Sequence, residues 1–502
     1  MKIQLSLLAL AVMAATSTQA MQALDDSSMS TVTGQAGLTI EQTTSGHEGL
    51  MLSTGEIKFT QADTAGKGEV DVTVDGMSVR SYIYDDTMPN NFGGFNTIKR
   101  VIDIDADGNL TMKTMDVDTM DIKIGAIAIG GRRVNSGIDI NVWKFASGSY
   151  LETEILNDPA GAKIISRTVM EVGSGYNQIV YENDVQISSD TVYLPNFGEA
   201  AFASEVILTS EANGLKLEVG ETRGTMEIQN LSILDENGIN VFGAGNSFGD
   251  LGYGNITVNK AYITIAASSD PLVRNGLEGK IYSDMEIGSA YYRTNNARMN
   301  FNNIKFTTGG ELTYNLEFMN NGYASGIEAQ FVSSGTASLR IGEMTFSNAH
   351  VDGLGNLNET TSLGGLAISN LSLNGGTAEV GLYTLSGYGV DGMRQVVNAT
   401  GKTSFDLEVF DEFDMNNYDN AALKAVAPKL TANIVINNFA QDQTINNTKK
   451  GIRILTASNS FDMNVNAIKV GNGSLYQGQS GRLVMNNVHQ VPGGYTNIEP
   501  LR

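Results

Sequence analysis

The stretch Met299-Asn300-Phe301-Asn302-Asn303-Ile304-Lys305-Phe306 decides how the rest of the chain is interpreted. Apolar residues occupy every second position at its start and again at its end, which is the period of a β-strand with one buried face. The pair Asn302-Asn303 breaks that alternation, because Phe301 and Ile304 are three positions apart. Both can face one core only if the chain reverses there in a hairpin or carries a β-bulge.

The same pattern recurs along the chain, often with Asn in its middle pair. It is found at Ile122–Ile129, Met226–Ile233, Leu339–Phe346, Leu366–Leu373 and Met463–Val470, and in shorter form at Ile434–Phe439 and Leu483–Val488. Irregular spacing between these segments argues against a solenoid, whose coils have a nearly fixed length. Hairpins remain open as an alternative, but their arms would be short for strands. The pattern favours bulges at Asn302-Asn303, Ser369-Asn370 and Asn437-Asn438, aligned so that they crease the sheet.

Composition supports the same fold class. The chain has 56 Gly, 7 Pro and no Cys, and it is rich in residues typical of strands and tight turns. We therefore predict an all-β protein made of elongated, curved antiparallel sheets with aligned bulges, trough-like or sandwich-like, joined by Gly- and Asn-rich turns. Almost no helix is expected after the leader. One short helix is predicted near residues 419–427, where Pro428 would end it.

Two hairpins are predicted by register. An Asp75-Gly76 turn would pair Val74 with Met77 and Val72 with Val79 on one face. A three-residue loop within the acidic segment 103–109 would pair Ala106 with Leu110, Ile104 with Met112 and Asp103 with Lys113.

The N-terminus predicts export. Lys2, an apolar run over residues 5–15 and the small-residue end Thr18-Gln19-Ala20 have the order of a signal peptide over residues 1–20. No later segment has the roughly 20 apolar residues of a membrane-spanning helix. We expect segment 21–41 to hold a leading motif and the first strand, 42–410 the main antiparallel body, and 411–502 a C-terminal β segment with the short helix.

The leading motif resembles the N-terminal signature of DUF6160, a family of exported gram-negative proteins of mostly unknown function. The matching residues are Leu24, Asp25, Asp26, Val32, Gly34, Gln35, Ala36 and Gly37, followed by the apolar strand Leu38-Thr39-Ile40. The resemblance implies an exported protein with a link to a pilus system and carries over no catalytic residue. From the residues themselves, the motif is either the lead-in to the first strand or a docking tag for an assembly partner.

The net charge and the sequence motifs argue against several classes of function. A formal charge of -23 disfavours nucleic acid as a partner, since phosphate binding needs clustered Lys and Arg. The three histidines, His47, His350 and His489, are far apart and form no predicted metal site. Ser247 lies in a Gly-rich segment that matches a nucleophile elbow in letters, but a strand and no helix is expected after it.

The acidic segment 103–109 has part of the pattern of a calcium site. Asp103, Asp105, Asp107 and Asn109 have the alternating spacing that opens a calcium loop, but Thr114 stands where the closing Glu is required. The segment is therefore interpreted as a hairpin first and a calcium site second.

These observations predict a non-enzymatic exported protein, structural or adhesive, associated with a pilus or fimbria-like system in the periplasm or on the outer surface. Its expected partners are other pilus-system or outer-membrane proteins. The main alternative is a periplasmic trough that binds lipid. An exported polysaccharide-active enzyme is a remote alternative, since carboxylate pairs cannot be located from sequence alone.

Overall fold

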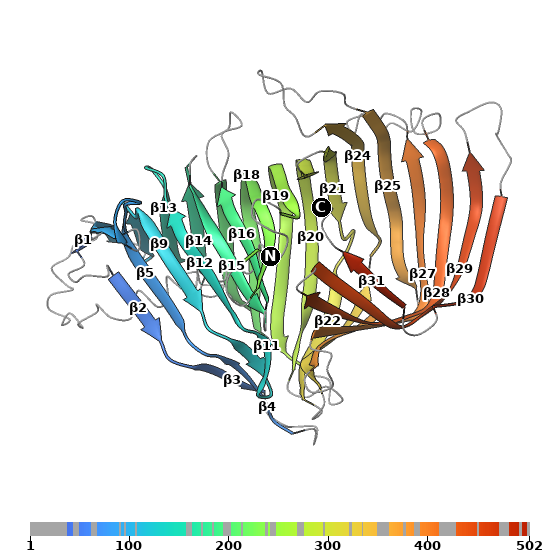
Figure 1. Ribbon diagram of the computed structural model, residues 1–502, viewed down its shortest axis with the longest axis horizontal. Coiled ribbons are helices and arrows are strands. Elements are labelled where there is room, and N and C mark those ends of the chain that lie inside the picture. Colours follow the sequence, from blue (N-terminus) through green and yellow to red (C-terminus); the bar gives the residue numbers. More distant parts are fainter. Residues whose placement is uncertain are drawn as a thin grey trace.

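A computed structural model shows an all-β protein built as one long, folded sheet (Figure 1). It describes residues 38–43, 50–61, 68–89, 92–94, 97–105, 108–156, 163–171, 174–182, 185–193, 202–211, 214–235, 239–240, 247–268, 276–294, 297–320, 324–333, 335–348, 361–374, 378–385, 392–410, 428–448, 451–470, 481–490 and 494–498. Within these residues, 27 strands form the main sheet and four form a smaller one, all pairs being antiparallel. The predicted fold class is confirmed, whereas the helix near 419–427 lies outside the described residues.

The main sheet is folded into two leaves that share their longest strands. The shared strands are β18 (Gly214–Asp235), β19 (Gly249–Ala267), β20 (Leu277–Arg293), β27 (Gly392–Phe410), β28 (Pro428–Thr448) and β29 (Gly451–Val470). Each pairs through one part in the first leaf and through the other part in the second. Figure 1 shows the result, with β24, β25, β27, β28, β29 and β30 upright and β22 and β31 passing beneath them at an angle.

The first leaf contains ten strands of its own. They are β1 (Leu38–Thr43), β7 (Thr97–Ile104), β8 (Leu110–Met115), β13 (Tyr150–Leu156), β14 (Lys163–Met170), β17 (Phe202–Glu211), β22 (Leu312–Asn320), β23 (Ala324–Ser333), β26 (Ala378–Leu385) and β31 (Gly494–Ile498). The shared strands are inserted after β17 and after β26, so the leaf begins at β1 and ends at β31.

The second leaf has a matching set. Its own strands are β2 (Leu50–Thr54), β5 (Met77–Tyr84), β9 (Thr119–Ile124), β12 (Gly137–Lys144), β15 (Gly175–Glu182), β16 (Val185–Tyr193), β21 (Ala297–Thr307), β24 (Ala337–Asn348), β25 (Thr361–Asn374) and β30 (Gly481–Gln490). This leaf begins at β2 and ends at β30, with the short β6 (Phe92–Gly94) paired to β5.

The chain runs straight through the Asn pairs of the repeated pattern. Residues 299–306 lie within β21 and residues 366–373 within β25, so neither segment reverses. The second Asn of each pair has a left-handed backbone, with φ of 54° at Asn303, 55° at Asn370 and 53° at Asn438. Among residues other than glycine, Asn adopts this conformation readily, which explains its recurrence in the pattern. The preference for a creased sheet over separate hairpins is confirmed.

The predicted bulges are correct at two of the three pairs. The strand register shifts at Asn370 against β27 and at Asn438 against β29, as an inserted residue requires. At Asn303 the register with both neighbours continues unshifted, so that residue marks a bend without an insertion. Gly288 of β20 lies level with Asn303, and an added Cβ there would lie 2.8 Å from the Asn255 side chain of β19 on its other side. Asn370 and Asn438 also oppose different segments of β27, so the two bulges lie at different creases of the sheet.

The hairpin predicted at Asp75-Gly76 is also wrong. A second sheet contains β3 (Ile57–Gln61), β4 (Val70–Val74), β10 (Ile127–Ile129) and β11 (Arg132–Asn135), and β4 pairs there with β3 and β10 instead of with β5. The chain continues through Asp75-Gly76 from one sheet into the other. Neighbouring strands do the same at residues 55–56 and 125–126, which lie level with it. An Asp-Gly pair suits this crease because Gly76 has φ +109°. The pair therefore marks a change of chain direction, but the change is a bend between two sheets and not a hairpin turn.

The acidic hairpin forms with a different register. β7 and β8 pair, but Ile104 lies opposite Leu110 and Asp103 opposite Thr111, two positions from the prediction. The carboxylate of Asp105 accepts hydrogen bonds from the backbone N–H of Asn109 at 2.9 Å and from its Nδ2 at 2.8 Å. These bonds and the backbone bond from Asp105 N–H to Asn109 O close the loop one residue earlier than predicted.

The best-buried core lies between the two leaves in the N-terminal half. Apolar side chains of β5, β9 and β12 in the second leaf pack with Met170 of β14 in the first. Trp143 of β12 stacks on Phe145, just after the same strand, at a ring-centroid distance of 5.0 Å. The cluster comprises Val79, Met120, Ile122, Ile140, Trp143, Phe145, Met170 and Ile228. Hydrophobic burial of this kind is the main stabilising contribution in a chain without disulfides.

The four-stranded sheet packs against β22, which lies far away in sequence. Gln61 is 1% exposed, and its side-chain amide pairs with the backbone of Phe318 through Nε2 to O at 3.0 Å and N to Oε1 at 3.1 Å. The Phe59 ring also contacts the Phe318 ring at 6.2 Å. β20 pairs with β22 only as far as Leu316, so the Gln61 amide takes the place of a strand at the next part of that edge. The N-terminal and C-terminal halves are thereby joined.

Candidate binding surfaces

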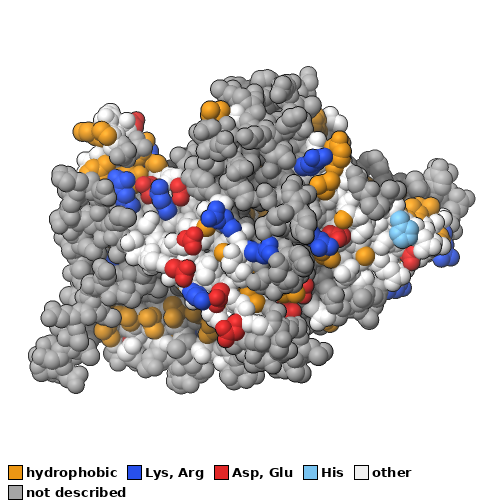
Figure 2. Space-filling view, turned by 60° about the horizontal axis from the view of Figure 1, so that its bottom comes forward, with side chains coloured by type: hydrophobic (Ala, Val, Ile, Leu, Met, Phe, Trp, Pro, Cys, Tyr) orange, Lys and Arg blue, Asp and Glu red, His pale blue; other side chains and the backbone are white. Residues whose placement is uncertain are grey.

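One face of each leaf carries charged side chains of alternating sign. In the first leaf, Arg167 contacts Glu152 at 2.8 Å, Glu154 at 3.0 Å and Glu205 at 2.8 Å, which joins β13, β14 and β17. Figure 2 shows red and blue side chains interspersed over one surface of the molecule. Because the charges neutralise one another locally, this face is solvated and offers no concentrated patch for a strongly charged ligand.

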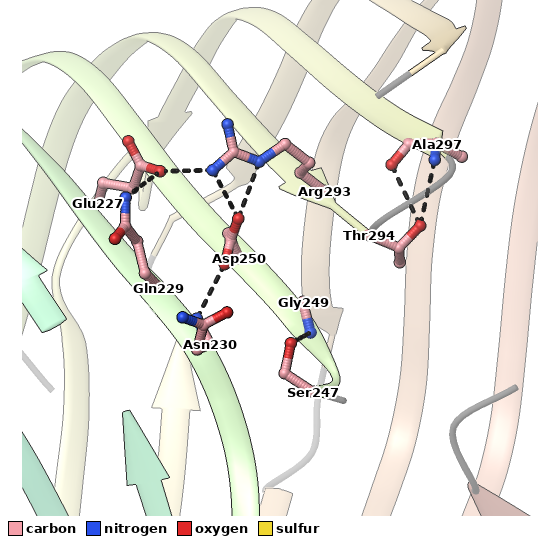
Figure 3. A network of polar contacts seen from close by, with 9 residues as sticks. All are labelled: Glu227, Gln229, Asn230, Ser247, Gly249, Asp250, Arg293, Thr294 and Ala297. Carbon is pink, nitrogen blue, oxygen red and sulfur yellow. Dashed lines mark hydrogen bonds and ion pairs between the residues drawn. The ribbon is translucent and has the colours of Figure 1, made fainter. Parts of the chain in front are cut away.

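The best-connected polar cluster joins β18, β19 and β20 (Figure 3). The guanidinium of Arg293 donates to Asp250 Oδ2 through Nε at 2.8 Å and Nη2 at 2.6 Å, and to Glu227 Oε1 at 2.9 Å. Asp250 also accepts from the backbone N–H of Asn230 at 2.8 Å. Burial and the nearby Glu227 carboxylate raise the pKa of Tyr291. The carboxylates are already paired, so the cluster acts as a structural clasp across three strands.

Local sequence gave no signal for this clasp. Glu227, Asp250 and Arg293 lie on three separate strands and become neighbours only through cross-strand register. Each follows the alternation of its own strand, which predicts a polar face but names no partner. Long-range pairing is therefore required to find the cluster.

The apolar face is less covered toward the C-terminal end. Phe405, Ile434, Val465 and Leu483 form one cross-strand row through β27, β28, β29 and β30. The first three are half-buried and Leu483 is 48% exposed, whereas Ile122 of the N-terminal core is 1% exposed. An amphipathic sheet with a partly open apolar face can contact another apolar surface or an elongated apolar ligand.

Strand β30 is exposed on both faces. Its burial alternates very little, and the adjacent residues Leu483 and Val484, which point to opposite faces, are 48% and 43% exposed. Tyr495 of β31 is 59% exposed. We refer to β30 and β31 together as the C-terminal edge.

The predicted calcium residues are brought together only in part. Asp105 and Asn109 contact each other across the β7–β8 loop, Asp103 points from an exposed strand position, and Asp107 lies outside the described residues. Lys113 contacts Glu152 at 4.0 Å and the Tyr150 ring at 3.6 Å. Within the described part of the chain, no group of three or more acidic or His residues could hold a metal ion.

The remaining candidate residues are distributed as follows. Ser247 Oγ accepts a hydrogen bond from the N–H of Gly249 at 3.1 Å where β19 begins, so it caps a strand (Figure 3). His489 is exposed on β30, while His47 and His350 lie outside the described residues. The leading motif Leu24 to Gly37 also lies outside them.

Fold and surfaces together define an all-β protein made of one creased, amphipathic sheet with an ion-paired face and an apolar face. Residues 1–106 match the family model of DUF6160, a family of unknown function. The match spans the leading motif and continues past the end of β7, which supports the family assignment made from that motif. Neither the curated proteins nor the solved structures contain a match. Among the described residues, no helix is long and apolar enough to cross a membrane.

Proposed function

We propose that this chain is a non-enzymatic exported protein that acts as a structural or adhesive component of a pilus or fimbria-like surface system. The observation that carries the proposal is the creased sheet itself, which extends through both leaves from β1 and β2 to β31 and β30. A long sheet with clasped polar faces and exposed end strands suits contact with other proteins.

Sequence evidence adds the compartment and the system. The signal-peptide pattern over residues 1–20 supports export, and the absence of cysteine fits a fold stabilised by packing alone. The leading motif resembles that of FilA, a member of the same family linked to a pilus system, as does the Gly- and Asn-rich β composition. Carboxylates in the clasp and in the Arg167 cluster are occupied by arginine, which fits a role without acid–base catalysis.

Localisation on intact cells tests this proposal. Immuno-electron microscopy and surface proteolysis should find the protein outside the cell, and deletion of the pilus operon should change its amount or position. A periplasmic marker protein provides the control for cell integrity. Protein that stays wholly periplasmic and is unaffected by the deletion would overturn the proposal.

A second candidate function is lipid binding in the trough. It is favoured by the row Phe405, Ile434, Val465 and Leu483, whose apolar side chains are only partly covered. Acyl chains are elongated and apolar, so a strip along several strands could hold them by burial alone.

Mass spectrometry of lipid extracted from purified protein separates the two functions. A lipid carrier isolated from native membranes should contain stoichiometric lipid, and Val465→Gln on the apolar row should reduce it. Asn464→Gln on the same strand faces the other way and serves as the control. Lipid-free wild-type protein would count against the carrier and leave the surface role standing.

A further inference from the structure

Both ends of the folded sheet present strands that pair on one side only, within the residues that the structure describes. At one end β1 pairs with β7 and β2 pairs with β5. At the other end β30 and β31 each pair with β29. Both leaves therefore stop at an open edge at each end, and open edges are templates for pairing with another strand. We refer to β1 and β2 as the N-terminal edge.

The direction of the strands makes the two ends complementary. Following the pairs from β1 to β31 gives sixteen strands in the first leaf, and from β2 to β30 gives sixteen in the second. The pairs that belong to the second leaf alone run from β2 to β30 and are also all antiparallel. Since every pair is antiparallel and the number is even, the first and last strands of each leaf run in opposite directions. A second copy placed end to end in the same orientation would continue the antiparallel order in both leaves.

The C-terminal edge has the chemistry of a strand that accepts a partner. β30 has ten residues, and Arg482 is its single Lys or Arg. Leu483 and Val484 expose apolar surface on opposite faces at 48% and 43%. Edge strands that avoid association usually carry several charges, a proline or a very short length. β30 has a bulge at Asn487 but retains a run from Gly481 to Met485 with neither proline nor acidic residue.

Charge distinguishes the two ends. The whole chain has a formal charge of -23, yet β30 and β31 contain Arg482 and no Asp or Glu. In the N-terminal edge, β1 contains Glu41, and neither β1 nor β2 contains Lys or Arg. Figure 2 shows orange, blue and red side chains around a pale blue histidine at one end of the molecule. Opposite charges favour contact between a C-terminal edge and an N-terminal edge over contact between two like edges.

From these observations we infer that copies of this chain associate head to tail, with β30 and β31 of one copy pairing with β2 and β1 of the next. Each leaf then continues across the junction through backbone hydrogen bonds, and Leu483 and Val484 become buried against the neighbouring strand. The interface joins two different surfaces, so it leaves a free edge at both ends and can extend into a filament.

The inference does not rest on the pilus proposal, because strand pairing between copies would lengthen a lipid-binding trough equally well. A strictly periplasmic protein could still assemble, and a surface protein could remain monomeric. The localisation test and the association test therefore fail separately.

The first experiment changes one exposed valine at the edge and one inside the sheet. Val484 of β30 and Val332 of the internal strand β23 are both 43% exposed, which makes them matched positions. The full exported chain should show concentration-dependent association in analytical ultracentrifugation, weakened by added salt. Val484→Glu puts a negative charge against the acidic N-terminal edge and should weaken association about tenfold or more, while Val332→Glu should behave as wild type. Circular dichroism verifies that both variants fold.

A mixing experiment tests the head-to-tail geometry. Leu52→Lys places a charge on β2 and should block the opposite end. The Leu52→Lys and Val484→Glu variants should each associate at least tenfold more weakly than wild type when alone, whereas an equal mixture should regain association, because each partner contributes one intact edge. A wild-type chain that stays monomeric up to its solubility limit would overturn the inference, and so would equal association of the Val484→Glu and Val332→Glu variants. Dimers of Leu52→Lys alone would show pairing between like edges and refute the head-to-tail arrangement.

Discussion

Asp462 of β29 holds the bulge at Asn487 of β30, since its Oδ1 accepts a 2.7 Å hydrogen bond from the Asn487 backbone N–H. Its Oδ2 lies 3.3 Å from Asn438 Nδ2, at the bulge of the strand on its other side. The same arrangement occurs at Val142 with Asp121 and at Asn230 with Asp250, both at 2.8 Å. A left-handed residue turns its N–H out of the ladder, and an Asp on the neighbouring strand satisfies it. The carboxylates of Asp121, Asp250 and Asp462 therefore stabilise the creases by accepting these hydrogen bonds.

Removing this carboxylate should loosen the C-terminal edge. Asp462→Ala removes a charge-assisted hydrogen bond at an exposed position, so we expect a loss of about 1 kcal/mol in unfolding free energy. Amide exchange at β30 should accelerate more than exchange in β21. Ser458→Ala, at an exposed position on the same strand, is the control. Equal exchange rates in the two variants would show that the bulge holds without Asp462.

Gly76→Val should destabilise the protein even though no hairpin forms there. Gly76 has φ +109°, and an added Cβ would lie 2.7 Å from the Thr54 backbone oxygen. We expect a loss of about 1 to 3 kcal/mol, measured by denaturant unfolding. Gly55→Val, level with it on the neighbouring strand, meets nothing within 4 Å and should cost less. Similar losses for both variants would contradict the crease geometry.

Removing the cation of the clasp in Figure 3 should lower the unfolding free energy more than breaking a surface ion pair does. Arg293→Ala would leave the Glu227 carboxylate, whose side chain is 5% exposed, without its cation. We expect a loss of about 2 to 4 kcal/mol, since unpaired buried charge is costly. Lys305→Ala breaks an exposed pair with Glu286 and should cost about 1 kcal/mol or less. Chemical denaturation of both variants measures the difference, and equal losses would mean that the clasp is effectively solvated.

Calcium should have little effect on stability. The Asp105 carboxylate already accepts two hydrogen bonds from Asn109, so the loop is closed without a metal ion. Melting curves recorded with millimolar calcium and with chelator should nearly coincide. A shift above roughly 5 °C, which corresponds to about 1 kcal/mol or more, would instead support the calcium interpretation of Asp103, Asp105, Asp107 and Asn109.

Short-range pattern was sufficient to predict the fold class and the through-running strands at Asn303 and Asn370. It failed at Asp75-Gly76, because a hairpin and a crease both need a residue with positive φ and satisfy the same local rule. It also missed the contact between Gln61 and Phe318, which are 257 residues apart. An isolated Gln next to a strand end carries no signal for a distant sheet edge. Such contacts depend on tertiary topology, which periodicity does not encode.

The left-handed Asn residues provide the most direct test of the repeated pattern. Asn303 is exposed and has φ of 54°, so its replacement changes backbone preference without removing core contacts. A β-branched residue is strongly disfavoured in this conformation, at a cost of about 1 to 2 kcal/mol.

We therefore expect Asn303→Val to lower the unfolding free energy by about that amount, and Asn303→Gly to remain close to wild type, because glycine adopts positive φ without steric cost. Thr313→Val is the control, since Thr313 is exposed on the regular strand β22, where valine suits extended backbone. Denaturant unfolding of the three variants gives the comparison. If Asn303→Val were as stable as Thr313→Val, the strand would not need a left-handed residue there, and the pattern that decides this fold would reflect side-chain packing rather than a crease.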